Sequence, residues 1–278
     1  MRKLRIVADS SCDLLELEGV EFEYAPLKII TAEREFVDNR QLDVGEMVNF
    51  FSKYKGRSKT SCPNPSDWLT AFGDAEDVVC VTITSGLSGS YNAACAAKRS
   101  YEAEHPDRRV FVVDSLSAGP EVTLVTEKLR DMAVSGIDYE EMCRRIGEYK
   151  KNTGLIFMLK SLKNFANNGR VSPAVAKIAG LVGICIVGKA STVGTLEPTH
   201  KCRGESRSLD ALLADLEAAG LDHGKVSIAH CYNAVAAERL KHMIHAKFKS
   251  AKVEIHPLRG LCSFYAELGG MLVGFEKM

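Results

Sequence analysis

Two short runs of hydroxyl side chains are the residues whose types and spacing best suit ligand chemistry. The first, Thr84-Ser85-Gly86-Leu87-Ser88-Gly89-Ser90, follows an apolar stretch and precedes a helical pattern that opens at Tyr91. A helix N-terminus offers free amides and partial positive charge, and hydroxyls add further donors, so this turn suits an anion. The second run, residues 59–66, also introduces a helix, with Pro65 near its start. We expect the two turns to hold one oxyanion between them.

The elements that position these turns alternate between short apolar runs and helical patterns. Such alternation predicts parallel strands joined by crossover helices. Three of the strands end in polar pairs, namely Asp9-Ser10, Thr84-Ser85 and Asp114-Ser115, and we expect these pairs to face one crevice at the carboxyl edge of the sheet. The expected strands are 4–8, 24–30, 78–83 and 110–113, and the expected helices are 43–54, 66–74 and 90–104.

The second half of the chain has a different pattern of expected strands and helices. Helical patterns at 118–135 and 139–151 lead into it, and we place a domain boundary near residue 152. The sequence therefore predicts an α/β protein with two domains: a parallel, Rossmann-like domain over 1–152 and a mixed or antiparallel α/β domain over 153–278. The expected strands are 155–158, 184–187, 194–198, 225–229, 253–258 and 271–275, and the expected helices are 159–166, 173–180, 206–219 and 233–248.

Composition excludes several classes of protein. Thirty-six basic residues balance 36 acidic ones, so no overall field favours nucleic acid or an anionic membrane. The longest apolar run, Ile178 to Val187, is too short to span a bilayer, and the N-terminus lacks a secretory apolar segment. Nine cysteines without C-x-x-C spacing indicate a reducing cytoplasm rather than a disulfide framework, and we expect no metal site despite His230 beside Cys231.

Two enzyme interpretations compete with simple anion binding. Residues 86–90 resemble the G-x-S-x-G turn of a serine hydrolase, with Ser88 as nucleophile, although Ser90 occupies the final glycine position. A hydrolase also needs a base, for which the candidates are His105, His200, His223 and His230. A nucleotide-binding enzyme is the other interpretation, but this sequence lacks both glycine-rich phosphate-binding motifs that such enzymes use. Asp9, Asp13 and Asp114 could form a magnesium cluster, but we favour the interpretation that they order the loops after the strands.

Several motifs, taken together and in order, resemble the DegV family over nearly the whole chain. They are Val7-Ala8-Asp9-Ser10-Ser11-Cys12-Asp13-Leu14, Pro26-Leu27, the run 59–66, the run 85–91, Val113-Asp114-Ser115, Gly169-Arg170-Val171-Ser172 and Lys201-Cys202-Arg203. Each motif is common by itself, whereas seven in register are specific.

The resemblance implies a non-enzymatic protein without cofactor that holds one long-chain fatty acid between two domains. In many bacteria, proteins of that family present the ligand carboxylate to a separate kinase subunit, which forms acyl phosphate. The family pattern places the carboxylate against Thr60, Ser61 and Ser88. It also makes Arg170 and Arg203 candidates for the carboxylate end or for docking the kinase subunit. The residues 157, 159, 162 and 178–187 could line an acyl tunnel or could belong to an ordinary core.

The tail of the chain departs from the family pattern. Members usually carry a C-terminal His that reaches the carboxylate, followed by Gly-Pro-Gly. Alignment on Phe275 puts Tyr265 where that His would be and Glu267-Leu268-Gly269 where Gly-Pro-Gly would be. A tyrosine hydroxyl donates a hydrogen bond but does not become cationic. We therefore expect the hydroxyls to carry more of the headgroup recognition here.

Overall fold

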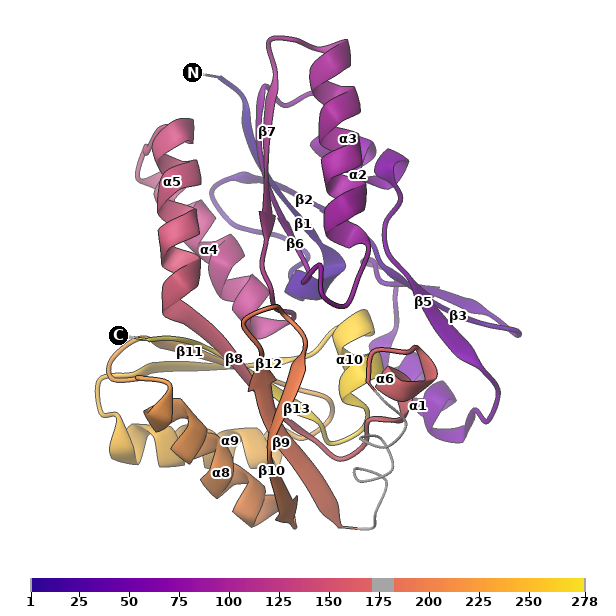
Figure 1. The fold of residues 1–278 in the computed structure, drawn as a ribbon, viewed down its shortest axis with the longest axis vertical. Helices are drawn as coiled ribbons and strands as arrows, with labels where there is room; N and C mark the ends of the chain where they lie inside the picture. The colour runs from indigo at the N-terminus through magenta and orange to yellow at the C-terminus, as the bar shows by residue number, and fades with distance from the viewer. Residues whose placement is uncertain (1, 172–182, 278) are drawn as a thin grey trace.

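The first half of the chain builds a parallel sheet covered by helices on both faces. The computed structural model describes residues 2–171 and 183–277. The sheet has the order β2-β1-β6-β7 and all its pairings are parallel. One face packs against α2 and α3 and the other against α4 and α5 (Figure 1). The bounds are β1 (Leu4–Asp9), β2 (Glu21–Ala25), β6 (Asp77–Thr82), β7 (Arg109–Asp114), α2 (Pro65–Phe72), α3 (Ser90–Glu104), α4 (Pro120–Val134) and α5 (Tyr139–Tyr149).

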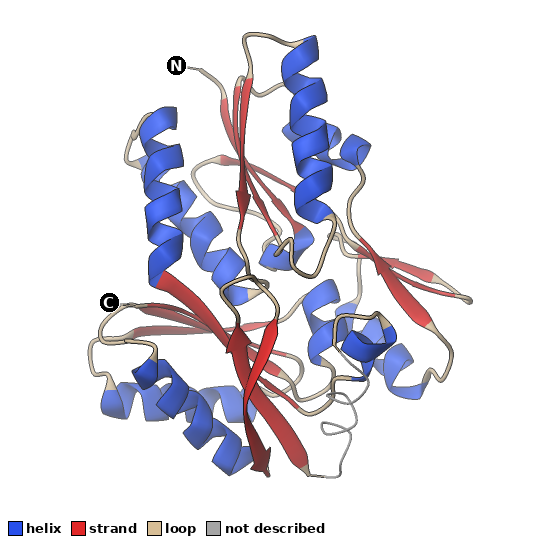
Figure 2. Ribbon diagram, viewed as in Figure 1, coloured by secondary structure: helices blue, strands red, loops and turns tan. Residues whose placement is uncertain are grey.

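A small antiparallel sheet projects from this half, in the order β4-β3-β5 (Figure 2). Its strands are β3 (Lys28–Thr31), β4 (Glu35–Val37) and β5 (Ser58–Ser61), and α1 (Val44–Lys53) packs beside it. The prediction of one strand over 24–30 was wrong: β2 and β3 belong to different sheets. Pro26 lacks an amide for ladder pairing, and the amide of Leu27 donates to the Ser10 hydroxyl instead.

The second half forms a mixed sheet of six strands in the order β10-β9-β8-β13-β11-β12, in which only β11 and β12 pair in parallel. Helices α8 and α9 cover one face, while α6 and α10 lie on the side of the first half (Figure 1). The bounds are β8 (Thr153–Leu159), β9 (Ile184–Ala190), β10 (Leu196–Arg203), β11 (Lys225–His230), β12 (Lys252–Pro257), β13 (Met271–Glu276), α6 (Lys163–Asn167), α8 (Glu205–Ala218), α9 (Ala234–Lys247) and α10 (Gly260–Ala266).

Strand β8 shows how this sheet separates its two faces. Side chains alternate across a strand, so neighbours face opposite ways. Ile156 and Met158 lie in the core under α8 and α9, whereas Phe157 and Leu159 lie in the cluster that faces the first half. The sheet therefore buries apolar side chains on both faces.

Two helix predictions in the second half need correction. The helix expected over 159–166 is shorter, because residue 159 still belongs to β8 and α6 starts only at Lys163. Helix α10 was not predicted at all. No side chain next to it in the sequence caps its first turn; instead the carboxylate of Asp38 accepts hydrogen bonds from the amides of Gly260 and Leu261, at 3.0 and 2.8 Å. The helix expected over 173–180 falls outside the described residues.

Candidate functional site

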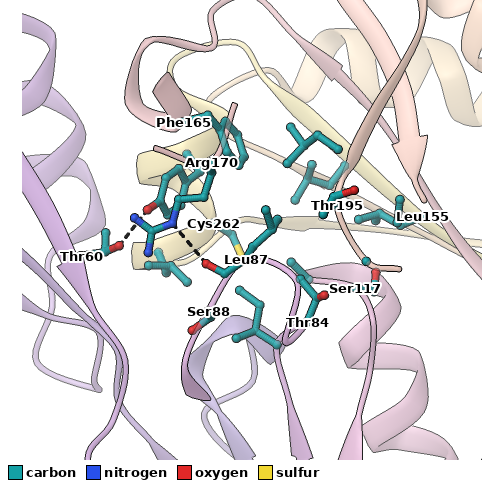
Figure 3. Close-up of a pocket in the computed structure, with 18 of the residues that line it drawn as sticks. Thr60, Thr84, Leu87, Ser88, Ser117, Leu155, Phe165, Arg170, Thr195 and Cys262 are labelled. Atoms are coloured by element: carbon teal, nitrogen blue, oxygen red, sulfur yellow. Dashed lines mark hydrogen bonds between the residues drawn. The ribbon is translucent and has the colours of Figure 1, made fainter. Parts of the chain in front are cut away.

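A cavity in the described structure lies where the carboxyl edge of the parallel sheet meets the inner face of the mixed sheet. Its volume is about 320 Å³, within the range of small-molecule sites. Figure 3 shows the hydroxyl turns of the first half on one side of it and apolar side chains of the second half on the other. The lining residues used below are Thr60, Ser61, Thr84, Leu87, Ser88, Ser117, Leu155, Phe157, Leu159, Arg170, Thr195, Tyr265 and Leu272.

The two hydroxyl turns meet at one end of this cavity. Thr60 and Ser61 come from the end of β5, and Ser88 comes from the turn between β6 and α3. Helix α2 starts at Pro65 under a capping box made by Asn64 and Asp67, which fixes the chain just after Ser61. The structure thus brings Thr60, Ser61 and Ser88 to the same cavity.

Tyr265 lies at this end as well. Its hydroxyl is 2.7 Å from the Thr60 Oγ1, and its ring packs on Phe165. Burial raises the pKa of the Tyr265 phenol, so the group stays a neutral hydrogen-bond donor across the neutral range. Helix α10 carries the residue and is held by Asp38, which belongs to the first half.

Arg170 supplies a positive charge beside these hydroxyls. Its Nε donates to the Leu87 carbonyl at 3.2 Å (Figure 3). Its Nη1 donates to the Asn168 carbonyl at 2.9 Å. The guanidinium also lies 5.9 Å from the centroid of the Tyr265 ring. Asn168 in turn accepts a bond from the Thr60 amide through its side chain. Backbone carbonyls orient the guanidinium without neutralising it, which leaves its charge available to an anion.

Arg203, the other arginine singled out in the sequence, does not line the cavity. It is the last residue of β10 and is exposed to solvent. Of the two roles expected for Arg203, its exposed position suits docking of a kinase subunit and not contact with the carboxylate.

The structure divides the residues that could line an acyl tunnel between the cavity and the ordinary cores. Phe157 and Leu159 line the cavity, together with Leu155 on the same strand face. Leu162 is buried but is absent from the lining. Of the run 178–187, residues 178–182 lie outside the described residues, and Ile186 and Val187 are packed in the cores.

The acids at the strand ends order loops, as the sequence predicts. The buried carboxylate of Asp9 accepts bonds from the Ile83 amide at 2.8 Å and from the hydroxyls of Ser11 and Ser90. Asp114 accepts from the amides of Ser85 and Leu116. The expectation that all three polar pairs face one crevice was wrong: of the six residues, only Thr84 lines the cavity. The others use their polar atoms on the loops.

The geometry around Ser88 does not assemble a hydrolase site. Its Oγ accepts the Ser90 amide at 3.3 Å, which is the local bond of a serine turn. None of the four candidate histidines lines the described cavity. His200 pairs with Asp215, and His230 accepts the amide of Asn233. A base is therefore not placed beside Ser88 within the described residues.

Sequence reasoning missed several lining residues, above all Ser117, Thr195 and Leu272. Ser117 follows the polar pair at the end of β7, so its neighbourhood carried a signal. Thr195 and Leu272 reach the cavity only through the way the second sheet packs.

The described residues contain few features of metal-binding or membrane proteins. No group of three or more His, Cys, Asp and Glu side chains in this part of the chain is placed to hold a metal ion. No helix among the described residues is long and apolar enough to cross a membrane. All nine cysteines fall in the described part, and none is in a disulfide bond.

Comparison with known proteins gives one consistent family. The model of the DegV family, described as uncharacterised proteins, matches residues 3–277. A DegV domain-containing protein of Streptococcus pneumoniae is 41% identical over 276 residues, which are 98% of each chain. A crystal structure of a Eubacterium eligens DegV family protein loaded with heptadecanoic acid has 44% identity and a TM-score of 0.96, and the match covers 99% of this chain and 100% of that one. The Streptococcus pneumoniae fatty acid kinase (Fak) B3 protein loaded with linoleic acid has 40% identity and a TM-score of 0.97, with the same coverage. The chain belongs to the DegV family.

Proposed function

We propose that this protein binds one long-chain fatty acid in the cavity, with the carboxylate at the end formed by Thr60, Ser61, Ser88, Arg170 and Tyr265. The observation that carries the proposal is the distribution of polar groups in the cavity: its lining is mostly apolar, with hydroxyls and a guanidinium at one end. An amphiphile with one anionic head satisfies both parts of that surface.

The energetics favour a long chain. Burial of a methylene group contributes about 0.8 kcal/mol, so the acyl chain supplies most of the affinity before the entropy of association is subtracted. The hydroxyls and Arg170 fix the direction in which the chain enters. Hydrogen bonds to a charged group are stronger than those to a neutral one, which favours the acid over an alcohol or an ester at this end.

The relatives support the same ligand class. The two solved structures compared above were crystallised with seventeen- and eighteen-carbon fatty acids, heptadecanoic and linoleic acid, and each is at least 40% identical to this chain. The likeness to the B3 protein of a fatty acid kinase leads us to propose further that a separate kinase subunit receives the carboxylate. Arg170 at the cavity and Arg203 at the surface are the residues that we propose for this contact.

A double variant tests the assignment of the carboxylate. We expect Ser61→Ala with Ser88→Ala to lower the affinity for octadecanoic acid about tenfold, because two donors to the charged head are lost. Affinity is measured by displacement of a fluorescent fatty acid. Ser58→Ala with Ser85→Ala is the matched control, since these hydroxyls lie in the same two segments but do not line the cavity.

The same assay separates the contribution of the carboxylate to affinity from that of the acyl chain. Octadecanol has the same chain without the carboxylate, and its affinity should change less than that of the acid. If the double variant binds octadecanoic acid as tightly as the unaltered protein, the carboxylate is not held where we propose. Labelling of Ser88 by a fluorophosphonate would favour the hydrolase instead.

A further inference from the structure

Glu267 has a backbone conformation that suits glycine rather than a residue with a side chain. It follows the last residue of α10 and has φ of 57° and ψ of 173°. Residues with a Cβ seldom occupy this region, because it is sterically unfavourable for them. The sequence also departs from the family pattern at this position. A side chain that is kept at the cost of backbone strain calls for a compensating role.

The carboxylate of Glu267 caps the start of α6. Its Oε1 accepts the Asn164 amide at 3.2 Å and the Ser161 hydroxyl at 2.9 Å. Leu162, at the N-cap position of α6, has no polar side-chain atom that could accept an amide. The Asn164 side chain adds a second link, since its Nδ2 donates to the Phe264 carbonyl of α10 at 2.7 Å. The first turn of α6 is therefore held to the end of α10.

The other end of α6 holds groups of the carboxylate end. The Arg170 amide donates to the Phe165 carbonyl at 2.8 Å. The Asn168 Nδ2 donates to the Asn164 carbonyl at 2.9 Å, and the Asn168 Oδ1 accepts the Thr60 amide at 3.1 Å. Figure 3 shows Phe165 and Arg170 together at this end of the cavity. A displacement of α6 would therefore carry Arg170 with it.

Glu267 itself does not line the cavity in the described part of the chain. Its effect on a ligand must therefore pass through α6 and the residues that α6 holds. A group that is fixed in place before the ligand arrives loses less entropy on binding than a mobile one. The cap on α6 can raise affinity in this way without any contact between Glu267 and the ligand.

We propose that Glu267 is a positioning residue for the carboxylate end, because its cap on α6 keeps the Arg170 guanidinium where the charged group of the ligand meets it. This inference rests on the proposed function and adds to it a residue outside the cavity. Hydrogen bonds between arginine and a carboxylate are strong, and they depend on the direction of the planar guanidinium. Glycine at position 267 would relieve the backbone strain, but it would leave α6 without this cap.

Glu267→Gly tests the proposal, since it relieves the strain and removes the cap together. We expect about tenfold lower affinity for octadecanoic acid in the fluorescent displacement assay, because a charge-assisted hydrogen bond is misaligned. Octadecanol lacks the charge, so its affinity should change by less than about twofold. Glu267→Gln should restore most of the affinity for the acid, because one oxygen accepts both bonds and glutamine retains that oxygen.

A double variant tests whether the effect passes through Arg170. In the Arg170→Gln background, Glu267→Gly should change the affinity for octadecanoic acid by less than about twofold, because the group that α6 positions is already absent. Tyr232→Gly is the matched control. Tyr232 has φ of 52°, so glycine relieves strain there too, and it is not among the residues that line the cavity. This control should leave the affinities for the acid and for octadecanol unchanged.

Four results would overturn the inference. The first is an unchanged affinity for octadecanoic acid in Glu267→Gly. The second is an equal loss for the acid and for octadecanol, which assigns Glu267 to the fold alone. The third is the same loss with and without Arg170. The fourth is that Glu267→Gln binds the acid as weakly as Glu267→Gly, which assigns the effect to the charge and not to the cap.

The same measurements separate this inference from the proposed function. If the unaltered protein does not bind octadecanoic acid, the proposed function fails. If it binds the acid and any of the four results is found, only the role of Glu267 fails. Thermal unfolding of the ligand-free variants reports whether a substitution damages the fold.

Discussion

The two walls of the cavity come from different kinds of sheet and carry different chemistry. The wall from the first half combines the end of the antiparallel strand β5, which carries Thr60 and Ser61, with loops that follow the parallel strands and contribute Thr84, Ser88 and Ser117. The wall from the second half is largely the face of the mixed sheet, and Leu155, Phe157, Leu159 and Leu272 dominate it.

Strand ends and strand faces differ because their backbones are differently satisfied. A strand within a sheet uses its amides and carbonyls in the ladder and presents only side chains, so a buried face is apolar. The loops beyond the carboxyl ends keep free amides and favour small polar side chains. One wall therefore supplies affinity by burial of methylene groups, and the other supplies direction by hydrogen bonds.

The largest expected effect separates the two faces of β8. Ile156→Ala should lower the free energy of unfolding by about 2 to 5 kcal/mol, because it leaves a void in the core under α8 and α9. Its effect on fatty acid affinity should be small. Leu155→Ala on the opposite face should cost less stability but weaken octadecanoic acid several-fold, since Leu155 contacts the cavity.

Urea unfolding and fluorescent displacement on both variants check this pair. The claim that the two faces of β8 have different roles is contradicted if Leu155→Ala leaves affinity unchanged, or if the two variants lose stability and affinity in the same proportion.

A pH effect should arise where the two halves are joined. The Oδ1 of Asp13, in the first half, accepts the amide of Arg259 just before α10, while its Oδ2 is buried without a partner among the described residues. Burial, with a contribution from Asp38, raises the Asp13 pKa to about 8. The folded protein thus keeps a proton that the unfolded chain releases near pH 4. The free energy of unfolding should fall as pH rises from about 4 to 8, by up to about 1.4 kcal/mol per pH unit, and then level off.

Asp13→Asn should make that fall with pH shallower. Asn tolerates the left-handed backbone of this position, where φ is 57°, and it keeps an acceptor for the Arg259 amide. Urea titrations at several pH values measure the difference between variant and unaltered protein. Identical slopes in both would mean that Asp13 titrates normally.

A smaller effect is expected where the walls touch through backbone. A Cβ on Gly86 would lie 2.6 Å from the carbonyl oxygen of Val193, in the turn between β9 and β10. Gly86→Ala must therefore push that turn away from the hydroxyl turn and open the cavity. We expect at least a tenfold loss of octadecanoic acid affinity. Gly147→Ala, in the last turn of α5 with open space around it, is the control and should bind normally. Equal affinities for the two variants would show that the turn yields freely.

The sequence predicts the hydroxyl wall better than the apolar one, for a physical reason. Turn residues are recognisable from the local sequence. The turns with Ser61 and Ser88 were found from hydroxyls and glycines placed before helical patterns. Apart from β2, the strands of the two larger sheets were also found, because alternation and apolar runs are local signals; β4 and β5 of the small sheet were not predicted, and β3 was merged with β2.

The parts that sequence could not give depend on distant contacts. Helix α10, which carries Tyr265, is capped by Asp38, more than two hundred residues away. Nothing in the run 260–266 itself indicates where that helix begins. The separation of Phe157 from Met158 follows from period-two alternation, but which face holds the cavity depends on how the two sheets pack.

The smallest effect that we predict concerns Tyr265, where the two walls share a hydrogen bond. Its hydroxyl meets Thr60 across the carboxylate end, and one neutral hydrogen bond contributes about 1 kcal/mol. Tyr265→Phe should therefore weaken the binding of octadecanoic acid about fivefold, and the loss should be constant from pH 6 to 9, because the raised pKa of Tyr265 keeps the phenol neutral throughout. Tyr265→His should instead make affinity depend on pH, with tighter binding below about pH 6.5 where an imidazole becomes cationic beside the carboxylate. Displacement titrations across this range distinguish the two. If Tyr265→Phe binds as well as the unaltered protein at every pH, the phenol does not take part in recognition, and the carboxylate is held by the wall from the first half together with Arg170.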